Sequence, residues 1–231
     1  VNESVNTKYV HGFFVCYYLN MQDFLNKKIY ILGVLILLFV VGIYYFVFSK
    51  NDYTNYPSKG TDIVAFGDSL IEGVGASSKS TNLVSLLSKR IGKPIVNLGI
   101  SGNTTADGLN RLSELDKYNP KVVIILLGGN DYLRKVPEET TFKNLDKIID
   151  DVHKRGSSVL LLGVRGGILK DNFNDNFEEL ADNNNVAFVS NVLSGLILDK
   201  KYMADEIHPN DEGYKKIVER VYPMLKELIK E

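Results

Sequence analysis

The stretch Ile63-Val64-Ala65-Phe66-Gly67-Asp68-Ser69-Leu70 decides the fold of this 231-residue chain. A short apolar run that leads directly into a turn signal is typical of a buried strand. Gly67 permits the unusual dihedrals of a sharp turn at the strand end. Ser69 would then lie just beyond the strand, where open α/β sheets place their ligands. The alternative is an ordinary loop serine, or a helix cap formed by Asp68 or Ser69.

From Thr61 to the C-terminus, strand-like and helix-like segments alternate. Further buried strands are predicted at residues 94–98, 121–127, 158–164 and 186–189. Helices with apolar residues at helical spacing are predicted at residues 80–91, 104–118, 137–155 and 174–183, with Asn210 placed to cap a last helix. This alternation predicts βαβ units, and therefore a parallel sheet with helices on both faces.

The composition is that of an ordinary globular domain. The formal net charge is -1, so no excess of positive charge favours a nucleic-acid partner. Hydrophobic residues make up 45% of the chain, which is ample for a core. Cys16 is the only cysteine, and this excludes a disulfide within the chain and a thiolate metal cluster. No cofactor is expected.

A long apolar run precedes the predicted domain. Residues 29–48 are apolar or aromatic apart from glycines, with Lys27 and Lys28 before the run and Lys50 after it. Such a run can cross a bilayer as a helix, and it is longer than most signal-peptide cores. The alternative is a helix buried in a protein core. The lysines weakly favour a cytoplasmic N-terminus, which would put the domain outside the cytoplasm as part of a single-pass membrane protein.

These features divide the chain into four predicted segments. Residues 1–28 form an N-terminal tail, 29–48 a transmembrane anchor, 49–60 a linker and 61–231 the folded domain. The linker is predicted from the polar composition of residues 51–60, which include a proline and a glycine. The chain opens with Val1, and we expect Met21 to be the natural start.

Three further polar segments follow predicted strands. They are Gly99-Ile100-Ser101-Gly102-Asn103-Thr104-Thr105, Gly128-Gly129-Asn130-Asp131 and Asp205-Glu206-Ile207-His208-Pro209. Because the carboxyl ends of parallel strands meet at one edge of a sheet, these segments and Ser69 are expected to converge. Taken singly, each segment could instead be ordinary turn chemistry or a polar loop before a helix.

The chain resembles the SGNH (GDSL) hydrolase family over residues 61–231. The matching blocks are Gly67-Asp68-Ser69-Leu70, Gly102, Gly128-x-Asn130-Asp131 and Asp205-x-x-His208. Residues 100–104 and 127–131 are most similar to the bacterial branch of acyl-thioesterases, lysophospholipases and arylesterases. The resemblance implies a flavodoxin-like three-layer α/β sandwich, with a five-stranded parallel sheet in the order 2-1-3-4-5. A membrane anchor departs from that branch, whose members are usually exported without one.

The residue types point to the same chemistry. A serine hydroxyl needs a neighbouring base to take its proton. His208 is the best candidate, because His11 precedes the apolar run and His153 falls late in a predicted helix. Asp205 is the third residue before His208, and on a turn this spacing lets its carboxylate reach and orient the imidazole. Ser69, His208 and Asp205 are therefore expected to form a catalytic triad that works through an acyl-enzyme.

Hydrolysis of an ester also needs donors for the oxyanion of the tetrahedral intermediate. The candidates are the backbone N–H groups of Ser69 and Gly102 and the side-chain amide of Asn130. Asp68 and Asp131 are expected to hold loops by accepting hydrogen bonds from backbone N–H groups.

Other functions are compatible with parts of the pattern. Asp68, Asp131, Asp205 and His208 could hold a metal ion, as in a phosphoesterase, but this set is sparse and leaves Ser69 unexplained. The domain could also remove acetyl groups from a carbohydrate, or be a membrane-tethered binding module without activity. An acyl-ester or lipid substrate is mildly favoured over a bare acetyl ester by two sets of apolar residues. Three follow the candidate nucleophile, namely Leu70, Ile71 and Val74, and four lie on predicted loops that could line a pocket, namely Tyr132, Leu133, Ile168 and Leu169.

Overall fold

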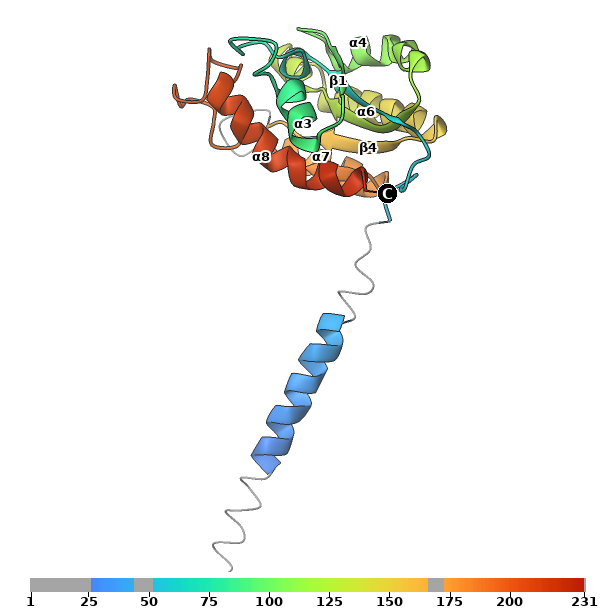
Figure 1. Ribbon diagram of the computed structural model, residues 1–231, viewed down its shortest axis with the longest axis vertical. Coiled ribbons are helices and arrows are strands. Elements are labelled where there is room, and N and C mark those ends of the chain that lie inside the picture. Colours follow the sequence, from blue (N-terminus) through green and yellow to red (C-terminus); the bar gives the residue numbers. More distant parts are fainter. Residues whose placement is uncertain (1–25, 44–51, 166–172, 231) are drawn as a thin grey trace, which may run out of the picture. The chain divides into compact units, whose positions relative to one another are not determined.

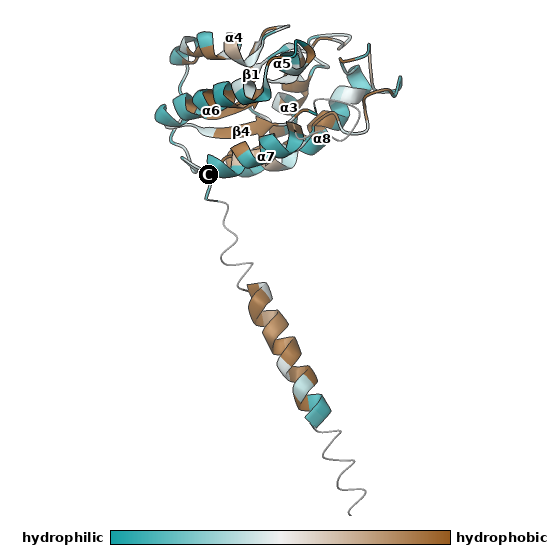
Figure 2. Ribbon diagram, turned by 180° about the vertical axis from the view of Figure 1, so that it is seen from behind, coloured by the Kyte–Doolittle hydropathy of each residue, from teal (hydrophilic) through white to brown (hydrophobic). Residues whose placement is uncertain are grey.

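The computed structural model describes residues 26–43, 52–165 and 173–230, and the chain divides into two units, Val1–Asn51 and Asp52–Glu231. In the first unit, the described residues form the helix Asn26–Ile43, which is exposed along its length and mostly apolar (Figure 2). Its mean hydropathy of 2.0 and its length would allow it to cross a membrane, and a signal sequence has the same properties. Met21 and residues 44–48 of the predicted anchor lie outside the described residues.

The second unit is built on a five-stranded sheet. The strands are β1 (Asp62–Gly67), β2 (Val96–Gly99), β3 (Pro120–Leu126), β4 (Ser158–Leu162) and β5 (Ala187–Val189). They are all parallel and lie in the order β2-β1-β3-β4-β5, which confirms the predicted topology (Figure 1). The central strands β1, β3 and β4 are buried almost throughout, as expected for continuous apolar runs with both faces covered.

Two layers of helices cover this sheet and complete the predicted three-layer sandwich (Figures 1 and 2). On one face, α3 (Leu83–Ile91) packs against α8 (Asp211–Leu228). On the other face, α6 (Glu138–Lys154) packs against both α4 (Thr105–Asn110) and α7 (Phe173–Asn183). The brown inner sides of these helices in Figure 2 correspond to the apolar stripes of the sequence.

The helix predicted at residues 104–118 is wrong as a single element. It is α4 followed by the 3-10 helix η1 (Leu112–Lys117), with Arg111 at the junction. Gly108 and Asn110 are weak helix formers near the end of α4. Two short helices at strand ends were not predicted, α2 (Ser69–Glu72) and α5 (Gly129–Leu133), because so few residues carry no periodicity.

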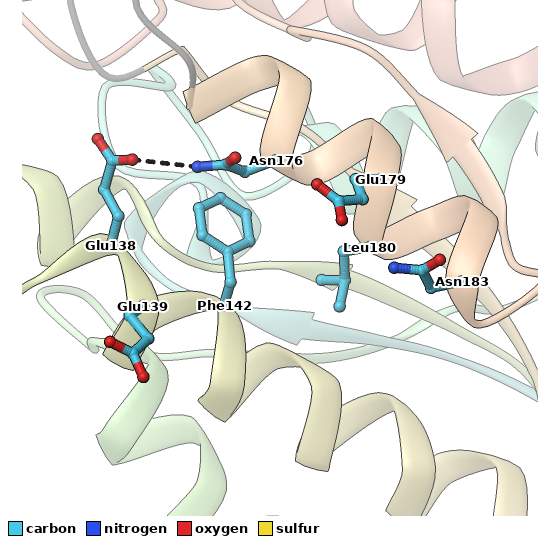
Figure 3. Close-up of a pocket in the computed structure, with 7 residues that line it drawn as sticks. All are labelled: Glu138, Glu139, Phe142, Asn176, Glu179, Leu180 and Asn183. Atoms are coloured by element: carbon cyan, nitrogen blue, oxygen red, sulfur yellow. Dashed lines mark hydrogen bonds between the residues drawn. The ribbon is translucent and has the colours of Figure 1, made fainter.

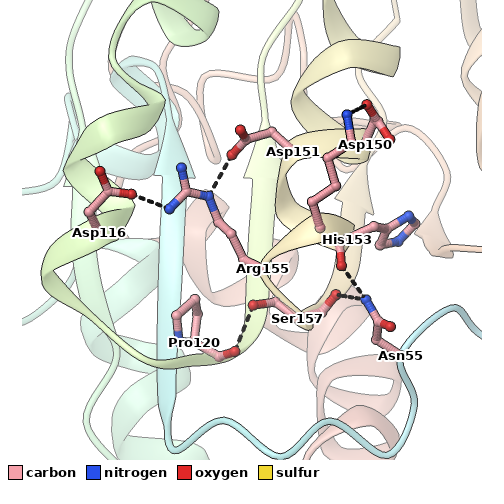
Figure 4. Close-up of polar contacts among 9 residues, drawn as sticks. Asn55, Asp116, Pro120, Asp150, Asp151, His153, Arg155 and Ser157 are labelled. Carbon is pink, nitrogen blue, oxygen red and sulfur yellow. Dashed lines mark hydrogen bonds and ion pairs between the residues drawn. The ribbon is translucent and has the colours of Figure 1, made fainter.

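The described part of the predicted linker, residues 52–60, belongs to the folded unit. Tyr53 and Tyr56 pack against the core, and the Thr54 backbone N–H donates to the Asn185 carbonyl at 2.8 Å. Asn55 Nδ2 donates to the His153 carbonyl at 2.8 Å (Figure 4). The unit therefore begins at Asp52 rather than at Thr61, because aromatic side chains in an otherwise polar segment bury their rings.

Candidate active site

Ser69 is the first residue of α2, directly after the end of β1. Asp68 caps this helix, and its Oδ1 accepts the backbone N–H of Leu70 at 3.0 Å. Gly67 does not adopt a left-handed backbone, contrary to the prediction from sequence. A side chain at Gly67 would instead meet the Leu126 carbonyl oxygen at 2.4 Å. Glycine is thus needed here for the close approach of β3, and this contact fixes where the turn places Ser69.

His208 brings Ser69 and Asp205 together. Its Nε2 lies 3.1 Å from Ser69 Oγ, and its Nδ1 lies 2.7 Å from Asp205 Oδ2. The loop that carries His208 is closed by the Ala204 backbone N–H, which donates to the His208 carbonyl at 2.8 Å. The side chain of His208 is 15% exposed, whereas that of Asp205 is 52% exposed.

The Asp205 carboxylate is held in its charged form. The hydrogen bond with the His208 ring, followed by the hydrogen bond from the Ile207 backbone N–H, lowers the pKa of Asp205 to about 2. Asp205 Oδ1 accepts the backbone N–H groups of Ile207 at 2.9 Å and His208 at 2.8 Å. Both carboxylate oxygens therefore act on the loop that carries the imidazole.

Gly102 and Asn130 come from two other loops at the same edge. Gly102 lies between β2 and α4 with a φ of 78°, a left-handed conformation that favours glycine. Asn130 is in α5, and its Nδ2 donates to the Asn103 carbonyl at 3.0 Å. This bond ties the loop after β3 to the loop that carries Gly102.

Asp68 and Asp131 have the structural roles predicted for them. Asp131 accepts the Thr105 backbone N–H at 2.8 Å and the Thr105 hydroxyl at 2.6 Å, while Asp68 caps α2. Burial raises the pKa of Asp68 to about 7, against the opposing effects of the Leu70 backbone N–H and the charge of His208. Among the described residues, no group of three His, Cys, Asp or Glu side chains is arranged to hold a metal ion.

The apolar residues taken from the sequence to favour an acyl substrate differ in burial, and Val74 is half-buried. Leu70 and Ile71 are buried in the core, so their apolar character serves packing and does not indicate the substrate. Tyr132 and Leu133 are exposed, and Ile168 and Leu169 lie outside the described residues. Within the described part of Asp52–Glu231, the exposed large apolar side chains are Ile100, Tyr132, Leu133, Leu198 and Ile207.

All of these but Leu198 lie in the segments that carry Gly102, Asn130 and His208, with Tyr132 and Leu133 in α5. A separate groove of about 250 Å³ lies between α6 and α7 (Figure 3). It is lined by Glu138, Glu139, Phe142, Asn176, Glu179, Leu180 and Asn183, and it shares no residue with the site.

Three side chains that hold the Gly102 loop were not predicted from the sequence. Glu72 Oε2 accepts the Ser101 backbone N–H at 2.6 Å, and Arg134 Nη2 donates to the Gly102 carbonyl at 2.8 Å. Arg111 contacts the same loop through Asn103. Glu72 is three residues after Ser69, and this proximity was the one usable signal.

Comparison with known proteins relates this chain to a characterised family. The sequence profile of the GDSL-like lipase/acylhydrolase family matches residues 65–216. The chain is 32% identical to "Esterase TesA" of Pseudomonas aeruginosa, over 72% of this chain and 89% of that protein. It is 30% identical to "Thioesterase 1/protease 1/lysophospholipase L1" of Escherichia coli, over 72% and 84% respectively.

The structural comparison agrees. A crystal structure of TesA superposes with a TM-score of 0.68 at 33% identity, covering 73% of this chain and 100% of that one. An esterase described as a member of the SGNH-hydrolase family superposes with a TM-score of 0.56 at 29% identity, covering 75% and 100%.

Proposed function

Because the chain belongs to the GDSL-like lipase/acylhydrolase family and is an SGNH-type ester hydrolase, we propose that it works through a Ser69–His208–Asp205 triad. The observation that carries this proposal is the position of the His208 ring, which lies between Ser69 Oγ at 3.1 Å and Asp205 Oδ2 at 2.7 Å. A nucleophile, its base and the group that orients the base define such a triad by geometry.

In the first half of the reaction, Ser69 Oγ attacks the ester carbonyl carbon. The Nδ1–H group of His208 donates a hydrogen bond to the charged Asp205 carboxylate. This fixes the tautomer in which Nε2 is unprotonated and can accept the Ser69 proton. The resulting imidazolium gives this proton to the departing alcohol or thiol, and an acyl-enzyme remains. Water then attacks the acyl-enzyme with His208 again as base, which frees the acid and restores Ser69.

The oxyanion is stabilised by donors from three loops. Ser69 is the first residue of α2, so its backbone N–H is not used in the helical ladder. The backbone N–H of Gly102 is the second donor. Asn130 Nδ2 carries two hydrogens, and since one is bound to the Asn103 carbonyl, the other is available to the oxyanion.

The triad is tested by Ser69→Ala measured with an aryl ester. Loss of the nucleophile should lower kcat by up to about 10⁶-fold, by analogy with other serine hydrolases. The thermal unfolding temperature should change little, because the hydroxyl is at the edge of the sheet and not in the core. Turnover close to that of the wild type would contradict the proposal.

The proposed substrates are single-chain acyl esters or thioesters. The exposed apolar side chains of Ile100, Tyr132, Leu133 and Ile207, in the segments that carry Gly102, Asn130 and His208, support this class. The activities for which the relatives are named also support it. A panel of aryl esters with increasing acyl length, an acyl thioester, a lysophospholipid and an acetylated sugar separates the choices. A carbohydrate O-acetylesterase would be favoured instead if the acetyl ester were the fastest of the aryl esters and the acetylated sugar the fastest substrate of the panel.

We further propose that the helix Asn26–Ile43, as part of the apolar run 29–48, anchors the domain to a membrane. Its length, hydropathy and exposed apolar side chains support an anchor. The full chain should then stay in the membrane fraction after an alkaline wash, and protease added to spheroplasts should remove the domain. Release by the wash would contradict the anchor, and cleavage of the helix from the mature protein would identify it as a signal sequence.

A further inference from the structure

A single arginine connects the strand that leads to Ser69 with the loop that carries Gly102. Arg111 lies at the junction of α4 and η1, and its side chain is only 11% exposed. Its Nη2 donates to the Gly67 carbonyl at 2.8 Å, and its Nε donates to Asn103 Oδ1 at 2.7 Å. Gly67 ends β1 just before Asp68 and Ser69, and Asn103 directly follows Gly102.

Two more contacts fix the plane of the Arg111 guanidinium. Its Cζ lies 4.0 Å from the centroid of the Phe66 ring, a cation–π contact. Its Nη1 donates to Glu114 Oε2 at 3.0 Å. A guanidinium presents its donors in a rigid planar fork, whereas a lysine ammonium is a compact point charge. The bridge therefore depends on the shape of arginine and not only on its charge.

Asn103 extends the bridge to Asn130, the third proposed oxyanion donor. Its carbonyl accepts Asn130 Nδ2 at 3.0 Å, and its backbone N–H donates to the Ile100 carbonyl at 3.2 Å. The Ile100 backbone N–H donates to the Gly67 carbonyl at 3.1 Å, so Ile100 and Arg111 share one acceptor. Residues 100–103 belong to no helix or strand, so the loop is held by these bonds together with those of Glu72 and Arg134.

We propose that Arg111 is a positioning residue, which sets the distance between the Ser69 hydroxyl and the oxyanion donors of Gly102 and Asn130. This inference rests on the proposed function, because the oxyanion hole that Arg111 would position is the one proposed above. A misplacement of about 1 Å can cost about 10²-fold in rate. Loss of the bridge should therefore lower kcat, while KM should change little because Arg111 itself touches no substrate.

Arg155 provides a matched control at the opposite edge of the sheet (Figure 4). It binds Asp151 Oδ1 at 2.5 Å and also pairs with Asp116, and its side chain is 24% exposed. Arg111→Lys and Arg155→Lys each replace a largely buried guanidinium group with an ammonium group. Both should therefore lower the thermal unfolding temperature. Only Arg111→Lys should lower kcat, by about 10- to 100-fold.

Two further measurements separate positioning from general destabilisation. Asn103→Ala removes the acceptor of Arg111 Nε but leaves the bond to Gly67, so it should lower kcat in the same direction by a smaller factor. If Arg111→Lys does not fold, Asn103→Ala alone tests whether the bridge positions the oxyanion donors. In an Asn130→Ala background, Arg111→Lys should reduce kcat by a smaller factor than in the wild type, because a donor that it positions is already gone.

The inference is overturned if Arg111→Lys and Arg155→Lys have equal kcat at a temperature where both are folded. It is also overturned if Arg111→Lys raises KM and leaves kcat unchanged, or if Asn103→Ala has the kcat of the wild type. Failure of the proposed function has a different signature, since Ser69→Ala and Asn130→Ala would then keep their activity.

Discussion

At the amino edge of the sheet, the Ser157 hydroxyl is bound to a backbone carbonyl, whereas at the carboxyl edge the His208 ring lies between two other side chains. Ser157 is fully buried, and its Oγ donates to the Pro120 carbonyl at 2.7 Å (Figure 4). His208 instead joins two side chains, Asp205 at 2.7 Å and Ser69 at 3.1 Å.

This difference distinguishes bonds that stabilise the fold from bonds that prepare a reaction. A buried hydroxyl that donates to a backbone carbonyl satisfies both groups within the protein, and its removal costs stability alone. In the proposed mechanism, the Ser69 hydroxyl and the second Nδ2 hydrogen of Asn130 instead act on the substrate. Variants at the amino edge should therefore change the unfolding free energy, and those at the carboxyl edge should change the rate.

The largest effect after loss of the nucleophile is expected for Asp205→Asn. The amide keeps the shape of the carboxylate but favours the wrong tautomer of His208, so kcat should fall by up to about 10⁴-fold. Steady-state kinetics on an aryl ester, with circular dichroism to verify folding, would measure this. A fully active variant would show that Asp205 does not orient the base.

Asn130→Ala should have an intermediate effect on rate. Removal of one oxyanion donor typically lowers kcat by about 10²–10³-fold, with little change in KM because the bond forms in the transition state. A rise in KM at unchanged kcat would make Asn130 a residue for ground-state binding. Asn176→Ala, in the groove between α6 and α7 (Figure 3), is a control that should leave kcat unchanged.

Asp68→Asn should show that burial of the Asp68 carboxylate lowers the unfolding free energy at the carboxyl edge. In the unfolded chain Asp68 loses its proton near the ordinary aspartate pKa of 3.8, whereas burial raises its folded pKa to about 7. Between these values the folded state binds more protons than the unfolded state, so the unfolding free energy contributed by Asp68 falls as pH rises. The variant should therefore gain stability relative to the wild type from about pH 4 to pH 7.

This difference should be constant above about pH 8, where Asp68 is ionised in both states. Denaturant unfolding of both proteins across this range isolates the effect, because the lowered pKa values of Asp107, Asp205 and Asp211 act equally in both. Parallel pH profiles for the two proteins would contradict the raised pKa of Asp68.

The smallest effect is expected for Ser157→Ala at the amino edge. It leaves the Pro120 carbonyl without its side-chain donor and should lower the unfolding free energy by about 1–2 kcal/mol. The values of kcat and KM should stay those of the wild type. A fall in kcat without a fall in stability would remove the distinction between the two edges.

The sequence predicted the elements whose burial is continuous and missed those that depend on distant contacts. The strand predicted at residues 121–127 is β3 (Pro120–Leu126), because a parallel strand with both faces covered is an unbroken apolar run. Residues 52–60 have the polar composition of a linker, but Tyr53 and Tyr56 pack against the core.

The site was predictable where its residues lie next to strand ends, and it was not where residues act across the fold. Ser69, Gly102 and Asn130 closely follow β1, β2 and β3, so parallel topology predicted that they would converge. His208 lies well beyond β5, and its part in the site was predicted from its chemistry and from the family motif. Arg111 reaches Gly67 across 44 residues of sequence, and in a predicted helix it resembled any surface arginine. Its partners are set by the tertiary position of the loop that carries Asn103, which no local sequence pattern encodes.

Covalent labelling of the full chain with a fluorophosphonate tests most directly whether Ser69 is an activated nucleophile. Intact and peptide mass spectrometry should find a single adduct, located on Ser69. The adduct should be absent from Ser69→Ala and should form far more slowly in His208→Ala, which retains the hydroxyl but lacks the base. Esterase activity that is lost on chelation of metal ions, with no adduct on Ser69, would contradict the triad and favour metal-assisted hydrolysis.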